Sequence, residues 1–330
     1  MKVFIDKNPL SGGHAVRGVG FYTKNLINSL GNTKEVELLD SPQGAEIIHY
    51  PYFDLFSHTL KIINKPTIVT IHDVIPFLYP KCYPPGIKGR INFFRQKRAL
   101  KYVAQIITDS ETSKKDIVRF LGVESNKVSV VYLAADDKFS KIKNKKVLED
   151  VRRKYDLPSM FVLYVGDINY NKNLETLCKA CIKAKKYLVI AGKAAQQVEE
   201  FSSFKHAELK HYKNLVECFK SKYIKRLGFV PDKDLIVLHN LADVYCQPSL
   251  YEGFGLPPLQ SLACGTPVIA ARTNTLVEVL GDAAEYFKPN DVGALAKLLR
   301  NDNFKTGNLP RKYSWEKTAH ETFKIYKQVL

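Results

Sequence analysis

The chain has 330 residues, of which 45% are apolar and 25% charged, which suits a folded protein of two domains. It has no apolar run of 18 residues, and a charged residue follows the first Met too early for a signal peptide, so we expect neither a transmembrane helix nor export. Cytoplasm is the expected compartment. The six scattered cysteines predict reduced, mostly buried thiols.

The net charge is +17, and it is heavier in the first half of the chain. Residues 1–155 carry 26 basic and 15 acidic side chains, whereas residues 156–330 carry 24 and 18. Such a field favours an anionic partner: nucleic acid, anionic lipid or a phosphorylated substrate, with solubility alone as the plain alternative.

In the first half, short β-branched runs alternate with helical stretches. Helices are expected at residues 20–30, 87–103 and 111–121. Strands are expected at residues 3–6, 36–40, 47–50, 67–72, 105–109 and 128–132. This alternation predicts βαβ units and a parallel sheet.

The helix near residue 90 is strongly basic. Residues 88–101 hold six basic side chains and no acidic one, interleaved with Ile91, Phe93, Phe94 and Leu100. A basic helix with aromatic residues can lie on an anionic membrane surface. An ordinary amphipathic helix on the protein surface would have the same sequence pattern.

A Lys-rich stretch at 138–154 is the expected domain boundary, after which the alternation resumes. A Cys178-x-x-Cys181 pair falls in an expected helix at 174–186, and we interpret it as core thiols. Strands are expected at 161–166, 188–191, 224–229, 244–247 and 267–270. Ligands of such sheets bind beyond the carboxyl ends of the strands, so two doubly wound domains predict a site in a cleft between them.

Residues 249–270 carry the strongest motif: a strand end, a Gly-rich turn and a helix. Gly253 and Gly255 allow unusual backbone angles and close ligand approach, and free N–H groups near Leu256 suit an anion. Glu252 at the mouth of this turn can accept hydrogen bonds from sugar hydroxyls.

This stretch resembles the family 4 glycosyltransferases, which are retaining enzymes of the GT-B type. The match includes Glu-Gly-Phe-Gly-Leu-Pro at 252–257 and Ala-Cys-Gly-Thr-Pro-Val-Ile at 263–269. Further segments resemble the family in the same order along almost the whole chain: 13–23, 70–76, 108–110, 164–174, 227–231 and 313–317. The resemblance implies two Rossmann-like domains, 1–150 for the acceptor and 151–312 for the donor, facing a central cleft. It also implies that a helix at 313–330 returns to the first domain.

The resemblance also implies roles for single residues. Glu252 would contact donor-sugar hydroxyls and stabilise positive charge at the anomeric carbon, Lys172 would bind the diphosphate, and His72 would contact the sugar or the reaction centre. The remaining donor-binding candidates are Gly18 and Gly20 for the phosphates, Phe229 and Val230 for the base, Gly253, Phe254, Gly255 and Leu256 in the turn, and Gln260.

Two departures from the family pattern stand out. Position 260, where the family has a second Glu for the ribose, is Gln260, which binds hydroxyls without a charge. Asn171 and Asp167 occupy places where the family often has an Arg, so fewer cations face the diphosphate unless another one, such as Arg17, substitutes. Both departures would weaken donor binding or slow turnover.

Expulsion of a nucleoside diphosphate requires positive charge, from a metal or from cations and helix dipoles. The one Asp-x-Asp, Asp232 and Asp234, opens a helix and is explained by capping and dipole pairing, so we expect neither a metal nor a cofactor.

The sequence of residues 72–80 resembles the mannosyltransferase-like branch of the family. GDP-mannose is therefore the first donor expected, and UDP-hexoses or UDP-N-acetylhexosamines are the next. The expected acceptor is a glycan or lipid-linked glycan in polysaccharide biosynthesis, reached by an enzyme peripheral to the inner membrane face. A nucleic-acid-binding protein without catalysis and a sugar-nucleotide epimerase or phosphorylase of GT-B shape are the competing interpretations.

Overall fold

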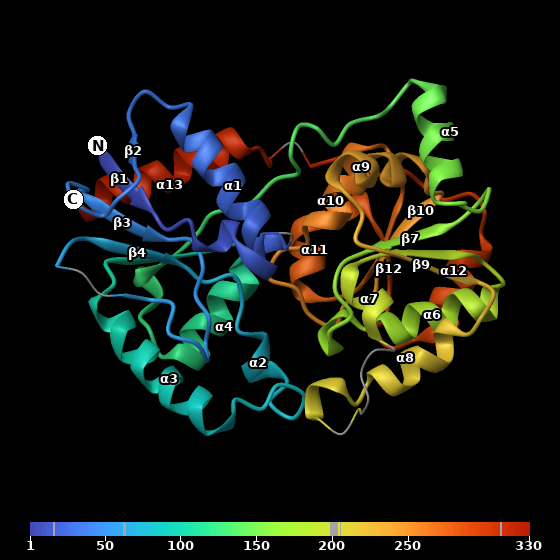
Figure 1. Cartoon of the computed structure of the whole chain (residues 1–330), viewed down its shortest axis with the longest axis horizontal. Helices are drawn as coiled ribbons and strands as arrows, with labels where there is room; N and C mark the ends of the chain where they lie inside the picture. Colours follow the sequence, from blue (N-terminus) through green and yellow to red (C-terminus); the bar gives the residue numbers. More distant parts are fainter. Residues whose placement is uncertain (16, 62–63, 199–203, 205, 311) are drawn as a thin grey trace. The chain divides into compact units, whose positions relative to one another are not determined.

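In the computed structural model, the strands form two separate parallel sheets (Figure 1). The structure describes residues 1–15, 17–61, 64–198, 204, 206–310 and 312–330. The chain divides into one unit of Met1–Leu78, Pro84–Ala134 and Arg311–Leu330, and a second of Tyr79–Tyr83 and Ala135–Pro310. Residues 138–154, expected as a boundary, therefore lie in the second unit, and part of them forms α5 (Lys145–Lys154).

The sheet of the first unit has the order β2-β1-β3-β4-β5-β6, and every pairing between neighbours is parallel. Its strands are β1 (Lys2–Ile5), β2 (Glu37–Leu39), β3 (Ile47–Tyr50), β4 (Thr67–Thr70), β5 (Gln105–Thr108) and β6 (Val128–Val130). All four residues of β3 and of β4 are buried, as in parallel strands covered on both faces.

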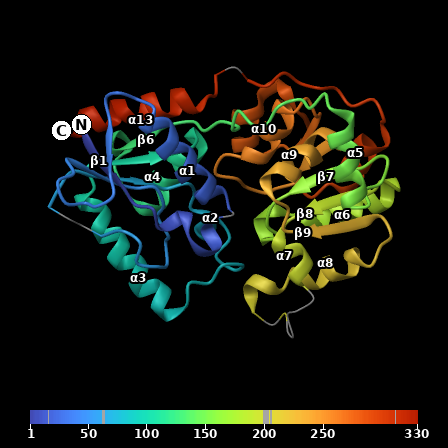
Figure 2. The same cartoon turned by 45° about the horizontal axis from the view of Figure 1, so that its top comes forward.

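Helices cover both faces of this sheet: α1 and α13 lie on one side, α3 and α4 on the other (Figures 1 and 2). Their bounds, with that of the short α2, are α1 (Gly18–Gly31), α2 (Ile75–Leu78), α3 (Gly86–Ala99), α4 (Glu111–Leu121) and α13 (Trp315–Val329). The side chain of Ser110 caps the start of α4, and Gly122 ends that helix in the left-handed conformation.

The C-terminal helix α13 is held to the first unit by buried polar contacts. The hydroxyl of Tyr326 lies 2.6 Å from Nδ1 of His49, whose Nε2 lies 2.8 Å from Oγ1 of Thr70. Burial lowers the pKa of His49 to about 3, so this ring is neutral. Thr318 donates to the carbonyl of Tyr132 at 2.7 Å. The prediction that the C-terminal helix returns to the first half of the chain is confirmed.

The sheet of the second unit has the order β12-β11-β10-β7-β8-β9, again all parallel. The chain runs outward from β7 to β9, then returns to the other side of β7 with β10, so β7 and β10 meet at a topological switch point. The strands are β7 (Val162–Val165), β8 (Leu188–Ala191), β9 (Ile224–Gly228), β10 (Val244–Gln247), β11 (Val268–Ala271) and β12 (Glu285–Phe287).

Helices α6, α8 and α12 cover one face of the second sheet, and α5, α9 and α10 the other (Figures 1 and 2). The helices are α6 (Leu174–Ala184), α7 (Lys193–Gln197), α8 (Tyr212–Phe219), α9 (Asp232–Leu241), α10 (Leu256–Ala263), α11 (Asn274–Leu280) and α12 (Val292–Arg300). Cys178 and Cys181 are fully buried in α6 as free thiols, which confirms their interpretation as core residues.

Candidate active site

Lys172 and Glu252 follow the two strands that meet at the switch point of the second sheet. Lys172 ends the short 3-10 turn Tyr170–Lys172 after β7, and Glu252 lies five residues beyond the end of β10. The carboxyl ends of adjacent parallel strands lie at one edge of the sheet, so the topology brings both side chains together.

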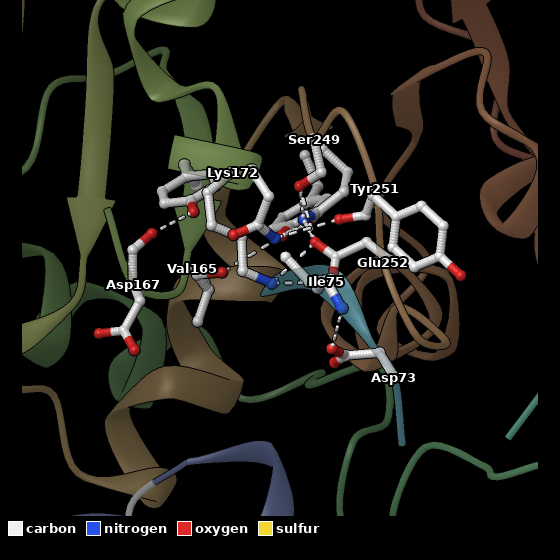
Figure 3. A network of polar contacts seen from close by, with 12 residues as sticks. Asp73, Ile75, Val165, Asp167, Lys172, Ser249, Tyr251 and Glu252 are labelled. Carbon is white, nitrogen blue, oxygen red and sulfur yellow. Dashed lines mark hydrogen bonds and ion pairs between the residues drawn. The ribbon is translucent and has the colours of Figure 1, made fainter. Parts of the chain in front are cut away.

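The two charges form an ion pair (Figure 3). The ammonium of Lys172 lies 2.8 Å from Oε1 and 2.7 Å from Oε2 of Glu252. Glu252 is only 7% exposed. A buried carboxylate needs such compensation, because removing a charge from water is costly unless it is paired and hydrogen-bonded.

Two further side chains fix the carboxylate of Glu252. Oε1 accepts a hydrogen bond from Ser249 Oγ at 2.6 Å and another from Gln247 Nε2 at 2.7 Å. The hydroxyl of Tyr245 donates to Oε1 of Gln247, which leaves Nε2 as the end of the amide that faces Glu252. Oε1 therefore accepts three hydrogen bonds, and its position is set from β10 outward.

Sequence reasoning did not identify Tyr245, Gln247 and Ser249. A signal was present, because Gln247 and Ser249 are polar residues at the end of an otherwise apolar strand that points to the motif. Both are fully or almost fully buried, a state that such residues adopt only with hydrogen-bond partners.

Asn171 connects the two loops that carry the ion pair. Its carbonyl accepts from Leu250 N at 2.7 Å, its amide nitrogen donates to the carbonyl of Tyr251 at 3.2 Å, and its amide oxygen accepts from the hydroxyl of Tyr83 at 2.8 Å. In the place where the family often has an Arg, this chain thus has a buried residue that holds the loop of Lys172 against that of Glu252.

The glycine turn (residues 252–256) leads into α10. Gly255 has φ +102°, in the region that favours glycine, whereas Gly253 has no positive φ. Of the two glycines predicted to have unusual backbone angles, only Gly255 therefore has one. Phe254 is buried beside them. Leu256 begins α10, and the two prolines that follow it have no N–H, so fewer backbone donors point out of this helix end than we expected.

Gln260 lies in α10, and the residue is only 6% exposed. Its amide can bind hydroxyls both as a donor and as an acceptor, which is the role predicted for it. Phe229, just after β9, is largely exposed, while Val230 beside it is buried. An exposed aromatic ring at a strand end can stack on a nucleotide base, which is the role predicted for it.

His72 in the first unit follows β4 and pairs with Asp109, which follows the adjacent strand β5. Nδ1 of His72 lies 2.6 Å from Oδ2 of Asp109, and Nε2 lies 3.1 Å from the carbonyl oxygen of Pro51. The carbonyl oxygen of Pro51 and an oxygen of the Asp109 carboxylate are both acceptors, so this geometry favours the imidazolium form, in which both ring nitrogens donate.

The pKa of His72 agrees with that assignment. Burial lowers the pKa, but the charge of Asp109 and the hydrogen bond to it, together with the charge of Asp73 and the hydrogen bond to Pro51, raise it more, so it lies above the ordinary 6.5. The other oxygen of Asp109, Oδ1, is buried without a partner among the described residues. Through its contact with Nδ1, Asp109 positions the ring of His72.

The predicted phosphate glycines occupy the start of α1. Gly18 is its first residue and has open space around the position of a Cβ. Gly20 is buried, and a Cβ there would lie 2.5 Å from the carbonyl oxygen of His14. Close packing of the preceding loop thus requires Gly20, which leaves Gly18 as the more accessible of the two.

Asp232 and Asp234 are both engaged with lysines. Lys138 Nζ lies 2.9 Å from Asp232, and Lys154 Nζ lies 2.5 Å from Asp234, which also accepts from Tyr155. No cluster of three or more His, Cys, Asp or Glu side chains suited to a metal occurs within the described ranges.

A parallel α/β unit with a cation–carboxylate pair and a glycine turn at its switch point is the arrangement of a glycosyltransferase of the GT-B class. A family model described as Glycosyltransferase Family 4 matches residues 9–139, and one described as Glycosyl transferases group 1 matches residues 149–303. The chain belongs to the family 4 glycosyltransferases. This assignment decides against the interpretation as a non-catalytic nucleic-acid-binding protein.

Known proteins resemble the chain along most of its length. O-antigen chain mannosyltransferase B of Escherichia coli is 29% identical over 296 residues, which are 85% of this chain and 74% of that protein. The serotype-specific mannosyltransferase WbdA of Escherichia coli is 27% identical over 295 residues, but this chain spans only 35% of its length. HepE of Anabaena, solved with UDP and glucose, shares the fold with a TM-score of 0.72 at 14% identity, covering 99% of both chains.

Proposed function

We propose that this protein transfers mannose from GDP-mannose to a hydroxyl of a glycan or lipid-linked glycan, with retention of anomeric configuration and without a metal. The Lys172–Glu252 pair at the switch point of the donor-type unit carries the proposal. The mannosyltransferases among its relatives support the choice of sugar. UDP-hexoses and UDP-N-acetylhexosamines are the alternative donors.

The proposed reaction breaks the bond between the anomeric carbon and the phosphate oxygen and forms one to the acceptor oxygen. The acceptor proton passes to the departing phosphate. Lys172 offsets the charge that grows on the diphosphate, and Glu252 and Gln260 hold sugar and ribose hydroxyls. Both ring nitrogens of His72 already have partners, Asp109 and the carbonyl oxygen of Pro51. Nε2 can donate a hydrogen bond to the sugar only if its contact with Pro51 breaks.

Purified protein mixed separately with GDP-mannose, UDP-glucose and UDP-N-acetylglucosamine tests the donor. We expect calorimetric binding and slow donor hydrolysis with GDP-mannose at a lower Kd than with either UDP-sugar, unchanged by EDTA. Preference for a UDP-sugar would replace mannose in the proposal, and loss of hydrolysis in EDTA would refute metal independence.

We also propose that α3 rests on an anionic membrane surface, where a lipid-linked acceptor would lie. Ile87, Ile91 and Phe94 are 83%, 48% and 70% exposed, and their spacing of four and three residues places them on one helix face. Of the four apolar residues expected to interleave with the basic ones, Phe93 and Leu100 instead pack on the core.

Basic side chains border this apolar stripe on both sides. At 100° per residue, Arg90 lies to one side of the stripe and Lys88 and Arg95 to the other, and all three are exposed. Apolar residues flanked by cations are typical of a helix that lies in the interface of an anionic bilayer. No described helix combines the length and hydropathy needed to cross a membrane.

Sedimentation with vesicles of phosphatidylcholine, with or without phosphatidylglycerol, tests this surface. We expect binding only to the anionic vesicles, lost in a variant with Ile87, Ile91 and Phe94 all changed to Ser. A variant with Lys88, Arg90 and Arg95 changed to Gln should bind more weakly, by about 1 kcal/mol per charge. Equal binding by the Ser variant and the native protein would refute the apolar contact.

A further inference from the structure

The ion pair poses a problem for the proposed function, on which this inference rests. Lys172 is proposed to bind the diphosphate of the donor and Glu252 its sugar, yet each is the partner of the other in the protein alone. The carboxylate and the diphosphate are both anions that need the same ammonium group.

Of the two partners, Lys172 is the one that can move. The carboxylate of Glu252 is fixed by Ser249 and Gln247, and Gln247 is fixed in turn by Tyr245. Lys172 has a flexible four-carbon stem and is partly exposed. The same ammonium can therefore point to Glu252 or to a ligand while the carboxylate stays in place.

We propose that Glu252 is an internal competitor of the diphosphate for Lys172. A fixed carboxylate that takes back the ammonium weakens the hold on the nucleoside diphosphate after transfer, and so speeds its release. The sugar of an intact donor offsets this competition by giving Glu252 hydroxyl partners in place of the cation. The nucleoside diphosphate product has no sugar, so it offers Glu252 no hydroxyl in place of Lys172.

The variant Glu252→Gln tests the competition through product binding. Its amide keeps an oxygen for Ser249 and Gln247 but removes the charge that attracts Lys172. We expect GDP, or UDP if the donor proves to be a UDP-sugar, to bind about threefold to tenfold more tightly by calorimetry, although sugar transfer falls. Glu252→Asp, which retracts the charge by one methylene, should give an intermediate Kd.

Two controls separate this effect from a general change of charge or fold. Glu217→Gln removes the same charge from an exposed pair with Lys220 on α8 and should leave the Kd unchanged. In a Lys172→Met background, Glu252→Gln should no longer tighten binding, because the contested cation is gone.

Both Glu252 variants must first show the melting temperature of the native protein. If they then bind GDP with unchanged or weaker affinity, the inference is wrong, because Lys172 would bind the Glu252 carboxylate and the diphosphate at the same time. Tightening that persists without Lys172 would also overturn it. If the native protein binds neither GDP nor UDP, the proposed function itself fails, which is a separate result.

Discussion

Each sheet of this protein places a cation and a carboxylate at the ends of two adjacent strands, but the two pairs are built differently. Lys172–Glu252 follows β7 and β10, and its carboxylate oxygen Oε1 accepts three hydrogen bonds. His72–Asp109 follows β4 and β5, and one oxygen of its carboxylate is buried without a partner among the described residues.

The difference shows how one arrangement can serve two purposes. A lysine ordinarily keeps its charge well above neutral pH, so this pair supplies a positive charge near neutrality. A histidine loses its charge near neutrality, so its pair depends on pH. The first pair suits an anion that is always charged, and the second suits a proton or a hydroxyl.

Removal of the lysine should have the largest effect. Lys172→Ala is expected to lower the rate of sugar transfer about 10²- to 10³-fold, because the departing diphosphate loses a positioned cation. The rate with saturating donor is the measurement. Lys179→Ala, which removes an exposed cation paired with Glu175 on α6, should keep the native rate. A similar loss in both variants would mean that net charge, rather than position, matters.

The glycines at the start of α1 allow a smaller test, on stability. Gly20→Ala should lower the free energy of unfolding by about 1–3 kcal/mol, since its Cβ would meet the backbone of His14 at 2.5 Å. Gly18→Ala, with nothing within 4 Å, should be neutral or stabilise the protein by up to about 1 kcal/mol. Denaturant unfolding of both variants measures the difference, and equal effects would contradict the packing role of Gly20.

The histidine pair predicts the smallest effect, a pH dependence. The pKa of His72 is raised above 6.5 in the folded protein, so the stability it contributes is fully present below about pH 6.5 and is lost as pH rises through the folded pKa. The unfolding free energy of the native protein should therefore decrease as pH rises above 6.5, and this decrease should be smaller in His72→Gln. Asp109→Asn should lower the pKa of His72 in an NMR titration, and an unmoved titration would exclude Asp109 as its cause.

The sequence predicted the two parallel sheets well, because buried parallel strands are continuous apolar runs. Residues 47–50, 188–191 and 244–247 were predicted to the residue. The strand β12 was missed, since its three residues, Glu285 to Phe287, are too short to form such a run. Helix α5 was missed because its lysines obscured the pattern of its few apolar residues.

The sequence names candidate residues for the site but not the contacts between them. A motif names Glu252 and Lys172, but the pairing of one with the other depends on which strands are neighbours in the sheet. The anchors Gln247 and Ser249 lie outside the motif and become visible only through burial and distance. The small number of backbone N–H donors at the start of α10, in contrast, could have been predicted from the two prolines there.

Neither unit is a continuous stretch of chain, and this constrains both synthesis and truncation. The first unit receives α13 only after residues 313–330 have been made, so the contact between His49 and Tyr326 cannot form while the second unit is being synthesised. Residues 135–310 produced alone would lack Tyr83, whose hydroxyl binds Asn171 next to Lys172. A fragment that is to keep the Lys172–Glu252 pair therefore needs the 79–83 loop grafted back, and cutting the chain at its midpoint would damage both halves.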